Sequence, residues 1–405
     1  MLKLCLSMIA AGLFVWSVSA SGQDLSLSRP GSLTFSQPGA ETSEGVFTAL
    51  PFKTSAYATA GYDDNVFLSH QNPIGSVYDE FGLGLDVNVG DQRTQLYSHG
   101  AAAMIGYWQR PGPKVDPNIN FDLSLTRQFS DRTVVTLESV LSYQAQPNVA
   151  SGIGALNQVA DYVYSQNRFS FGYQWSKRFA TFTNYSFNIL NYNSSSIGNT
   201  EDRIEQNVSE EFRYLLRPNI VALVQYQFQD EAYFHDSPND SQSHFFLGGA
   251  DFMLSPRFTF SFRGGAELRY QQIGASEEHL YPYAEATFDY TFRPNSTIEW
   301  YNRYGLEESD LGPAGYRKTY RTGLNIIWAL AAKTSVNAAA YYSNSEYYGP
   351  VAPIENDVEV DLGASYMLTR KTTLNFGYSF TRDFSPIPSQ AYVVNRVHIG
   401  LSYAF

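Results

Sequence analysis

The last nine residues, Val397-His398-Ile399-Gly400-Leu401-Ser402-Tyr403-Ala404-Phe405, place an apolar residue at every second position and end on an aromatic ring. Successive side chains of a β-strand point to opposite faces, so this pattern predicts a strand with one apolar and one polar face. The chain therefore ends on a strand suited to lie between an apolar and a polar environment.

The same alternation recurs along the chain. After Pro256, Phe258, Phe260 and Phe262 share one predicted face, and Arg257, Ser261 and Arg263 share the other. A slip of one residue would move every charged side chain to the apolar side, so the pattern predicts the register as well as the strand. Two stretches fit poorly: Glu210 falls on the apolar side of its run, and residues 96–108 have no clean polar face.

Two kinds of break separate these runs. The short turns lie at residues 90–93, 130–132, 176–178, 217–219, 255–257, 293–296, 331–333 and 369–371. Longer breaks rich in Gly, Pro, Asn and Ser alternate with them, at 110–113, 147–157, 193–199, 236–240, 309–315, 349–356 and 385–390. Short turns at one end and longer loops at the other are typical of transmembrane barrels. With a first strand at about 54–68 and a last at about 392–405, the pattern predicts about eighteen strands.

The predicted fold is therefore all-β: a transmembrane, antiparallel, up-and-down β-barrel over residues 54–405. Thirty Tyr and twenty-eight Phe at strand spacing are typical of a lipid-facing wall with aromatic girdles. A β-propeller could also give a repeat of this length, but its strands are shorter than these runs. The predicted location is the bacterial outer membrane, where Tyr403 and Phe405 would form the C-terminal signal read by the barrel-assembly machinery.

Residues 1–20 read as a signal peptide, with Lys3, an apolar core and Val18-Ser19-Ala20 as a cleavage site. Residues 21–53 are polar and aperiodic, which predicts a periplasmic tail rather than a plug. Cys5, the single cysteine, would leave with the signal peptide, which excludes disulfides and thiol catalysis in the mature chain. Loss of Lys3 takes the net charge from −12 to about −13, which argues against nucleic acid as a partner.

A barrel of this size leaves an aqueous channel, so the polar face is expected to line it. The candidate pore-lining residues are the charged side chains that alternation places inward: Arg263, Glu267, Arg269, Glu285, Asp289, Glu299, Arg303, Arg317, Arg321, Glu359, Asp361 and Arg396. They could stiffen the wall by pairing with one another. They could also create a transverse field that orients solutes, with a mild preference for cations.

Other features leave alternatives open. Tyr57, Tyr283, Tyr301 and Tyr341 also fall on the inward face, as wall packing or as a track for sugar rings. The break at 144–160 is either a surface loop or a loop that folds inward. The six His are dispersed without metal-ligand spacing, and nucleophile-elbow and phosphate-loop patterns are missing from the sequence. We therefore expect no enzyme activity, metal or cofactor.

The first predicted strand contains Gly61-Tyr62-Asp63-Asp64-Asn65-Val66-Phe67. This stretch resembles the opening of an outer-membrane β-barrel porin family associated with exopolysaccharide gene clusters, in which a Gly-Tyr/Trp-Asp-Asp/Ser-Asn motif is typical. The resemblance implies the exit conduit for a secreted polysaccharide chain, working with a periplasmic polysaccharide-export protein. The alternative is a stand-alone diffusion porin for small hydrophilic solutes.

Overall fold

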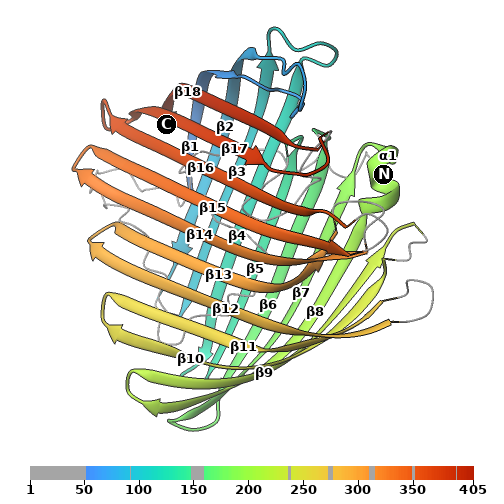
Figure 1. Ribbon diagram of the computed structural model, residues 1–405. Helices are drawn as coiled ribbons and strands as arrows, with labels where there is room; N and C mark the ends of the chain where they lie inside the picture. Colours follow the sequence, from blue (N-terminus) through green and yellow to red (C-terminus); the bar gives the residue numbers. More distant parts are fainter. Residues whose placement is uncertain are drawn as a thin grey trace.

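Eighteen antiparallel strands form one closed barrel (Figure 1). The computed structural model describes residues 52–91, 93–146, 159–235, 239–271, 277–309, 315–348, 352–388 and 390–405. Each strand pairs with its neighbours in the sequence, and the ring closes where the first strand pairs with the last. The predicted fold and strand count are confirmed. The predicted signal peptide and most of the predicted tail lie outside the described residues.

The strands alternate in direction around the ring, and one short helix lies in a loop. Their bounds are β1 (Phe52–Asp63), β2 (Ser76–Gly90), β3 (Thr94–Tyr107), β4 (Val115–Ser130), β5 (Thr133–Gln144), β6 (Tyr162–Gln174), β7 (Phe179–Tyr192), α1 (Ser195–Glu201), β8 (Arg203–Arg217), β9 (Ile220–Tyr233), β10 (Ser241–Ser255), β11 (Phe258–Gln271), β12 (Glu277–Arg293), β13 (Ser296–Glu308), β14 (Tyr316–Ala331), β15 (Thr334–Tyr348), β16 (Ile354–Met367), β17 (Thr372–Asp383) and β18 (Tyr392–Ala404).

All short turns predicted from the sequence join consecutive strands at one rim of the barrel. The two ends of the barrel meet at this same rim, because the backbone N–H of Phe405 donates to the carbonyl oxygen of Thr54 at 2.9 Å. This rim is the periplasmic one if the barrel follows the usual arrangement of short turns inside and long loops outside.

Three predicted boundaries were wrong. The first strand ends at Asp63 rather than near Leu68, because the chain turns away after the strand and Leu68 adopts a positive φ of 54°. The break at 193–199 is not a plain loop, since α1 occupies most of it. The break at 349–356 ends early, because Ile354 already pairs with β15.

The alternation of faces holds around the ring. Outer-face residues are exposed apolar side chains, such as Phe81 at 60% and Ile399 at 54% exposure. Inner-face residues on the same strands are polar, as predicted. Glu210 is a real exception: it lies on the outer face near the middle of β8 and accepts a hydrogen bond from Thr183 Oγ1 at 2.6 Å. In the described part of the chain, no helix is long and apolar enough to cross a membrane.

Candidate functional site

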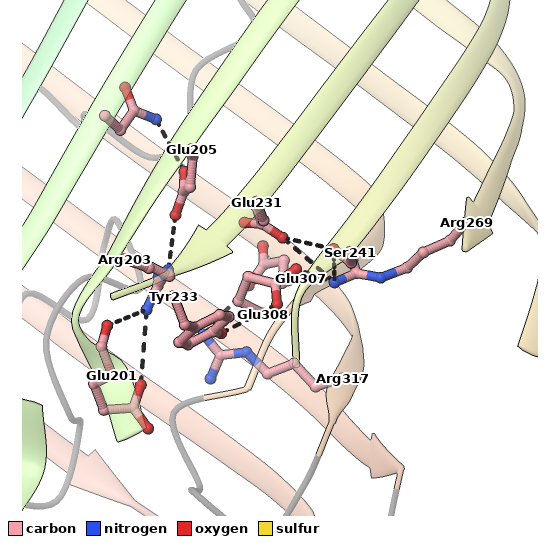
Figure 2. A network of polar contacts seen from close by, with 11 residues as sticks. Glu201, Arg203, Glu205, Glu231, Tyr233, Ser241, Arg269, Glu307, Glu308 and Arg317 are labelled. Carbon is pink, nitrogen blue, oxygen red and sulfur yellow. Dashed lines mark hydrogen bonds and ion pairs between the residues drawn. The ribbon is translucent and has the colours of Figure 1, made fainter. Parts of the chain in front are cut away.

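The charged side chains on the inner face of β8–β14 form several neighbouring clusters of ion pairs, here together called the packed sector, and Figure 2 shows part of it. One centre of it is Arg269 on β11. Its Nη2 donates to Ser241 Oγ at 2.9 Å and to Glu231 Oε2 at 3.4 Å, and it also pairs with Glu308. These groups are almost entirely buried, so the pairs are shielded from solvent and only weakly screened by salt.

A second centre is Glu307 on β13, which binds three arginines. Its carboxylate accepts hydrogen bonds from Arg321 Nε at 2.9 Å and Nη2 at 2.8 Å, a bidentate arrangement. Arg317 Nη2 lies 3.5 Å and Arg303 Nη1 lies 3.8 Å from the same carboxylate. Bidentate Arg–carboxylate pairs combine strength with fixed geometry, so Glu307 holds three long side chains in one arrangement.

A third centre lies nearer the rim that carries the short turns. Arg263 on β11 approaches Glu285 at 3.6 Å, Asp251 at 3.7 Å and Glu211 at 3.4 Å. Glu211 also pairs with Arg213, whose guanidinium lies 4.6 Å from the centre of the Phe182 ring. The lumenal charges of this sector therefore pair with one another.

Several of these contacts join strands that are far apart around the ring. Tyr233 on β9 donates through its hydroxyl to Glu308 on β13 at 3.3 Å. Four strand spacings separate these strands, which is about 19 Å along the wall. A Tyr and a Glu side chain can meet over that span only if the wall curves sharply. The packed sector therefore fills the inner side of a tight bend around β9–β12.

Some inner-face charges on other strands are easier to reach. Asp86 on β2, Glu138 on β5, Arg168 on β6 and Arg396 on β18 have side chains 22–34% exposed, and we call them the accessible sector. In the packed sector, Glu211 and Arg263 are 0% and 5% exposed. Solvent therefore reaches the inner wall at these four residues, whereas other inner-face carboxylates outside β8–β14, such as Asp361 at 6% exposure, are buried.

The remaining predicted pore-lining residues divide between the two regions. Glu267 accepts a hydrogen bond from Ser243 Oγ at 2.7 Å and lies 3.9 Å from Arg269, inside the packed sector. Asp289 on β12 accepts from Thr259 Oγ1 at 3.2 Å, and Glu299 stands opposite it on β13. Glu359 and Asp361 follow each other on the inner face of β16, outside the packed sector.

The first-strand motif ties the first strand to the last. Asp63 binds Arg396 Nε at 2.7 Å through one oxygen. Asp64 accepts from both the backbone N and the Nδ2 of Asn395, each at 2.7 Å. Asn65 Nδ2 donates to the carbonyl oxygens of Ser69 and Val393, both at 2.9 Å. We call these three residues the seam clasp.

The other two motif residues also have defined places. Gly61 lies on the inner face beneath the ring of Tyr78, and Tyr62 is exposed on the outer face. The clasp closes the β1–β18 seam at the rim that carries the long loops, because the short turns and the chain ends lie at the other rim. A role in closing the barrel accounts for the polar groups of the motif.

The inner-face tyrosines are wall packing. Tyr57, Tyr283 and Tyr341 are each less than 10% exposed, so their rings present little surface to a passing sugar. Tyr301 is partly buried and packs against Tyr341. The centre of the 144–160 break lies outside the described residues, but Val159 at its end packs against Leu68, Tyr392 and Val394. That end of the loop therefore reaches across the mouth to β18.

The network also contains residues whose place on the inner face was not predicted, namely Arg203, Glu231, Glu307 and Glu308. Arg203 looked like a loop residue, yet it begins β8 and its Nε donates to Glu205 at 2.9 Å. Alternation could have found Glu231 and Glu307. It could not have found Glu308, because consecutive residues of a strand point to opposite faces, and only the end of β13 turns both carboxylates toward arginines.

Tyr403 and Phe405 end the chain with exposed rings packed edge to face, 5.4 Å apart. Within the described ranges, no group of three or more His, Cys, Asp or Glu side chains is placed to hold a metal ion.

Solved structures similar to this barrel are outer-membrane proteins of low sequence identity. The outer membrane protein opdK from Pseudomonas aeruginosa is 8% identical, with 87% of this chain and 99% of that chain covered and a TM-score of 0.46. OccAB2 from Acinetobacter baumannii is 11% identical, with 87% and 98% covered and a TM-score of 0.43. The siderophore receptor PirA from Pseudomonas aeruginosa is 9% identical, with 87% and 80% covered and a TM-score of 0.41.

Among curated proteins, none matches this sequence. The sequence model of the family described as Putative beta-barrel porin 2 matches residues 44–405, which is nearly the whole chain. The closed eighteen-stranded wall, apolar outside and polar inside, is the architecture expected of such a protein. This chain therefore belongs to the Putative beta-barrel porin 2 family, as an outer-membrane β-barrel of porin type.

Proposed function

We propose that this barrel is a passive, water-filled conduit whose cargo is a secreted exopolysaccharide. The observation that carries the proposal is that the barrel has an apolar outer face and a polar inner face. Solvent reaches part of the inner face at Asp86, Glu138, Arg168 and Arg396. A hydrated chain can pass such a wall without adhering to it. The polysaccharide itself rests on the resemblance of the first-strand motif to barrels associated with exopolysaccharide gene clusters.

In this proposal the barrel acts as a channel rather than as an enzyme. Its partners are outer-membrane lipid, the barrel-assembly machinery and a periplasmic polysaccharide-export protein that delivers the polymer to the short-turn rim. The buried state of the inner tyrosines supports a wall along which a polymer slides without stacking. The accessible sector carries two carboxylates, Asp86 and Glu138, and two guanidinium groups, Arg168 and Arg396, so these charges balance and favour neither an anionic nor a cationic polymer.

A stand-alone diffusion porin is the second candidate. It is favoured by the packed sector, because ion-paired side chains that fill one side of the lumen leave a smaller bore for the solute. A narrow bore suits small hydrophilic solutes at least as well as a polymer.

An in-frame deletion with complementation separates the two candidates. Secreted polysaccharide is measured in the medium, and polymer retained in the periplasm is measured after cell fractionation. Loss of secretion with periplasmic accumulation, reversed by the plasmid-borne gene, supports the conduit. Unchanged secretion refutes it and leaves the diffusion porin, which planar-bilayer conductance with candidate sugars then tests directly.

A further inference from the structure

Glycines stand opposite tyrosines at mid-height on the inner wall. Gly82, near the middle of β2, is the cross-strand partner of Tyr57 on β1. Gly323, near the middle of β14, is the partner of both Tyr301 on β13 and Tyr341 on β15. Each ring therefore lies next to a position that has no side chain of its own.

The missing side chains leave the space that the rings occupy. A Cβ atom at Gly82 would lie 2.3 Å from Cε1 and Cζ of Tyr57. A Cβ atom at Gly323 would lie 2.2 Å from Cε1 of Tyr301 and 2.8 Å from Cδ1 of Tyr341. Carbon atoms that are not bonded favour separations of about 3.5–4.0 Å. Even a methyl group would therefore displace these rings.

The burial of the rings shows that they lie against the wall. Tyr57 is 8% and Tyr341 is 4% exposed, although both belong to the inner face of the barrel. Side chains of a strand usually stand roughly perpendicular to the sheet, which here would mean pointing into the lumen. A glycine at the cross-strand position leaves room for the ring to lie along the wall instead. Glycines paired with cross-strand aromatics are a known device of β-sheets.

The arrangement recurs nearer the long-loop rim. A Cβ atom at Gly61 would lie 2.4 Å from Cζ of Tyr78, and one at Gly305 would lie 2.8 Å from Cδ2 of Tyr283. The barrel therefore uses the same device at several heights. The mid-height positions matter most for passage, because a solute must cross them wherever the loops lie.

We propose that Gly82 and Gly323 set the bore of this pore by holding Tyr57, Tyr301 and Tyr341 flat against its wall. They are size-determining residues, and what they limit is the cross-section of a hydrated solute or polymer. A side chain at either position pushes a ring toward the axis, because the backbone lies behind the ring and neighbouring strands flank it. This inference rests on the proposed pore function.

The experiment is single-channel conductance of the purified, refolded full barrel in planar lipid bilayers with potassium chloride. Gly323→Ala is compared with wild type and with Gly248→Ala. Gly248 is a matched control: it lies on the outer face of β10, and its nearest neighbouring atom would be 4.0 Å from an added Cβ. Retention of the compact form on unheated denaturing gels shows that each variant is folded.

Gly323→Ala should lower the conductance by roughly a third, because one or two rings then occupy part of a channel of limited width. Gly248→Ala should conduct like wild type. Adding Tyr301→Ala and Tyr341→Ala to Gly323→Ala should restore the conductance. If Gly323→Ala does not fold, the pair Gly82→Ala and Gly82→Ala with Tyr57→Ala makes the same test elsewhere on the wall.

Three results would overturn the proposal. One is a folded Gly323→Ala barrel that conducts like wild type. Another is a fall in conductance that removal of the rings does not reverse, since the cause would then be a general distortion of the wall. The third is a wild-type barrel that passes no current, which refutes the pore function and this inference together. The first two results leave the pore function intact. Failure of this inference alone can therefore be told apart from failure of the pore function.

Discussion

The sharpest test of the packed sector is Glu307→Gln. The substitution keeps the size of the side chain but removes the charge that holds Arg303, Arg317 and Arg321 together. It also replaces one carboxylate oxygen with an amide NH2, which donates hydrogen bonds and cannot accept one from a guanidinium. The three arginines would remain buried, but the negative charge that offsets their positive charges would be gone.

Two magnitudes follow. Removing one partner of a buried ion pair costs about 3–5 kcal/mol of folding stability. The inner wall also gains one positive charge. At about 7 Å in water, one unit charge changes the energy of a passing ion by about 0.6 kcal/mol. This corresponds to a change of about threefold in local ion concentration at low salt, and less as salt screens the charge.

Both effects can be measured on barrels refolded into lipid vesicles. Urea unfolding followed by tryptophan fluorescence gives the stability, and the reversal potential in a salt gradient gives the selectivity, which should shift toward anions. Glu346→Gln is the control, because Glu346 pairs with Lys318 on the outer face and both side chains are partly exposed. Exposed pairs contribute about 0–1 kcal/mol. Equal stability of the two variants would refute the reasoning.

Three further predictions concern the seam, the chain end and a turn. Asp64→Ala removes two hydrogen bonds to Asn395 and should lower the stability of the barrel by about 2–4 kcal/mol in urea unfolding. The control is Asp230→Ala at the same rim, which removes one exposed hydrogen bond and should cost under about 1 kcal/mol. Equal losses in the two variants would contradict the seam clasp. Phe405→Ala should lower the amount of barrel inserted in cells but leave the stability of refolded protein nearly unchanged, so an equal loss in both assays would argue against an assembly signal. The backbone N–H groups of Arg93 and Thr94 donate to Asp91 and lower its pKa. The stability that Asp91 gives the turn should therefore be fully present above a pH of about 3.9 and be lost as the pH falls through the lower pKa of the folded state. An amide NMR shift of Thr94 that does not change over this pH range would contradict the prediction.

The sequence was a good guide wherever the governing interaction is local. Alternation placed Arg263, Glu267 and Arg269 on the inner face, because the period of a strand is two and lipid penalises a wrong register. The short turns were also correct, since Asn, Asp, Ser or Pro marks six of the eight directly and the other two, 331–333 and 369–371, interrupt the alternation. The end of the first strand was misjudged at Leu68, because Val66 and Phe67 continue the apolar pattern while Asp64 and Asn65 already bond to β18.

The pattern of ion pairs could not be predicted in the same way. Arg263 reaches Glu211 three strands away, and Tyr233 reaches Glu308 four strands away. Such contacts depend on how sharply the wall bends, and the bend is a property of the whole ring rather than of any strand. Alternation gives the face of a side chain but not the distance across the lumen. The orientation of the tyrosine rings could not be predicted either, because it depends on a glycine in another strand.

The burial of the packed sector follows from this bend. Where the wall curves sharply, inner-face side chains from β8–β14 converge, and the arginines and carboxylates there pair with one another largely out of reach of solvent. At Asp86 and Glu138, on strands outside the packed sector, the side chains remain partly exposed. The same residue types therefore occupy two environments in one ring. Where arginines and carboxylates converge they hold the wall together, and where they stay exposed they contribute to the charge of the surface that solvent reaches.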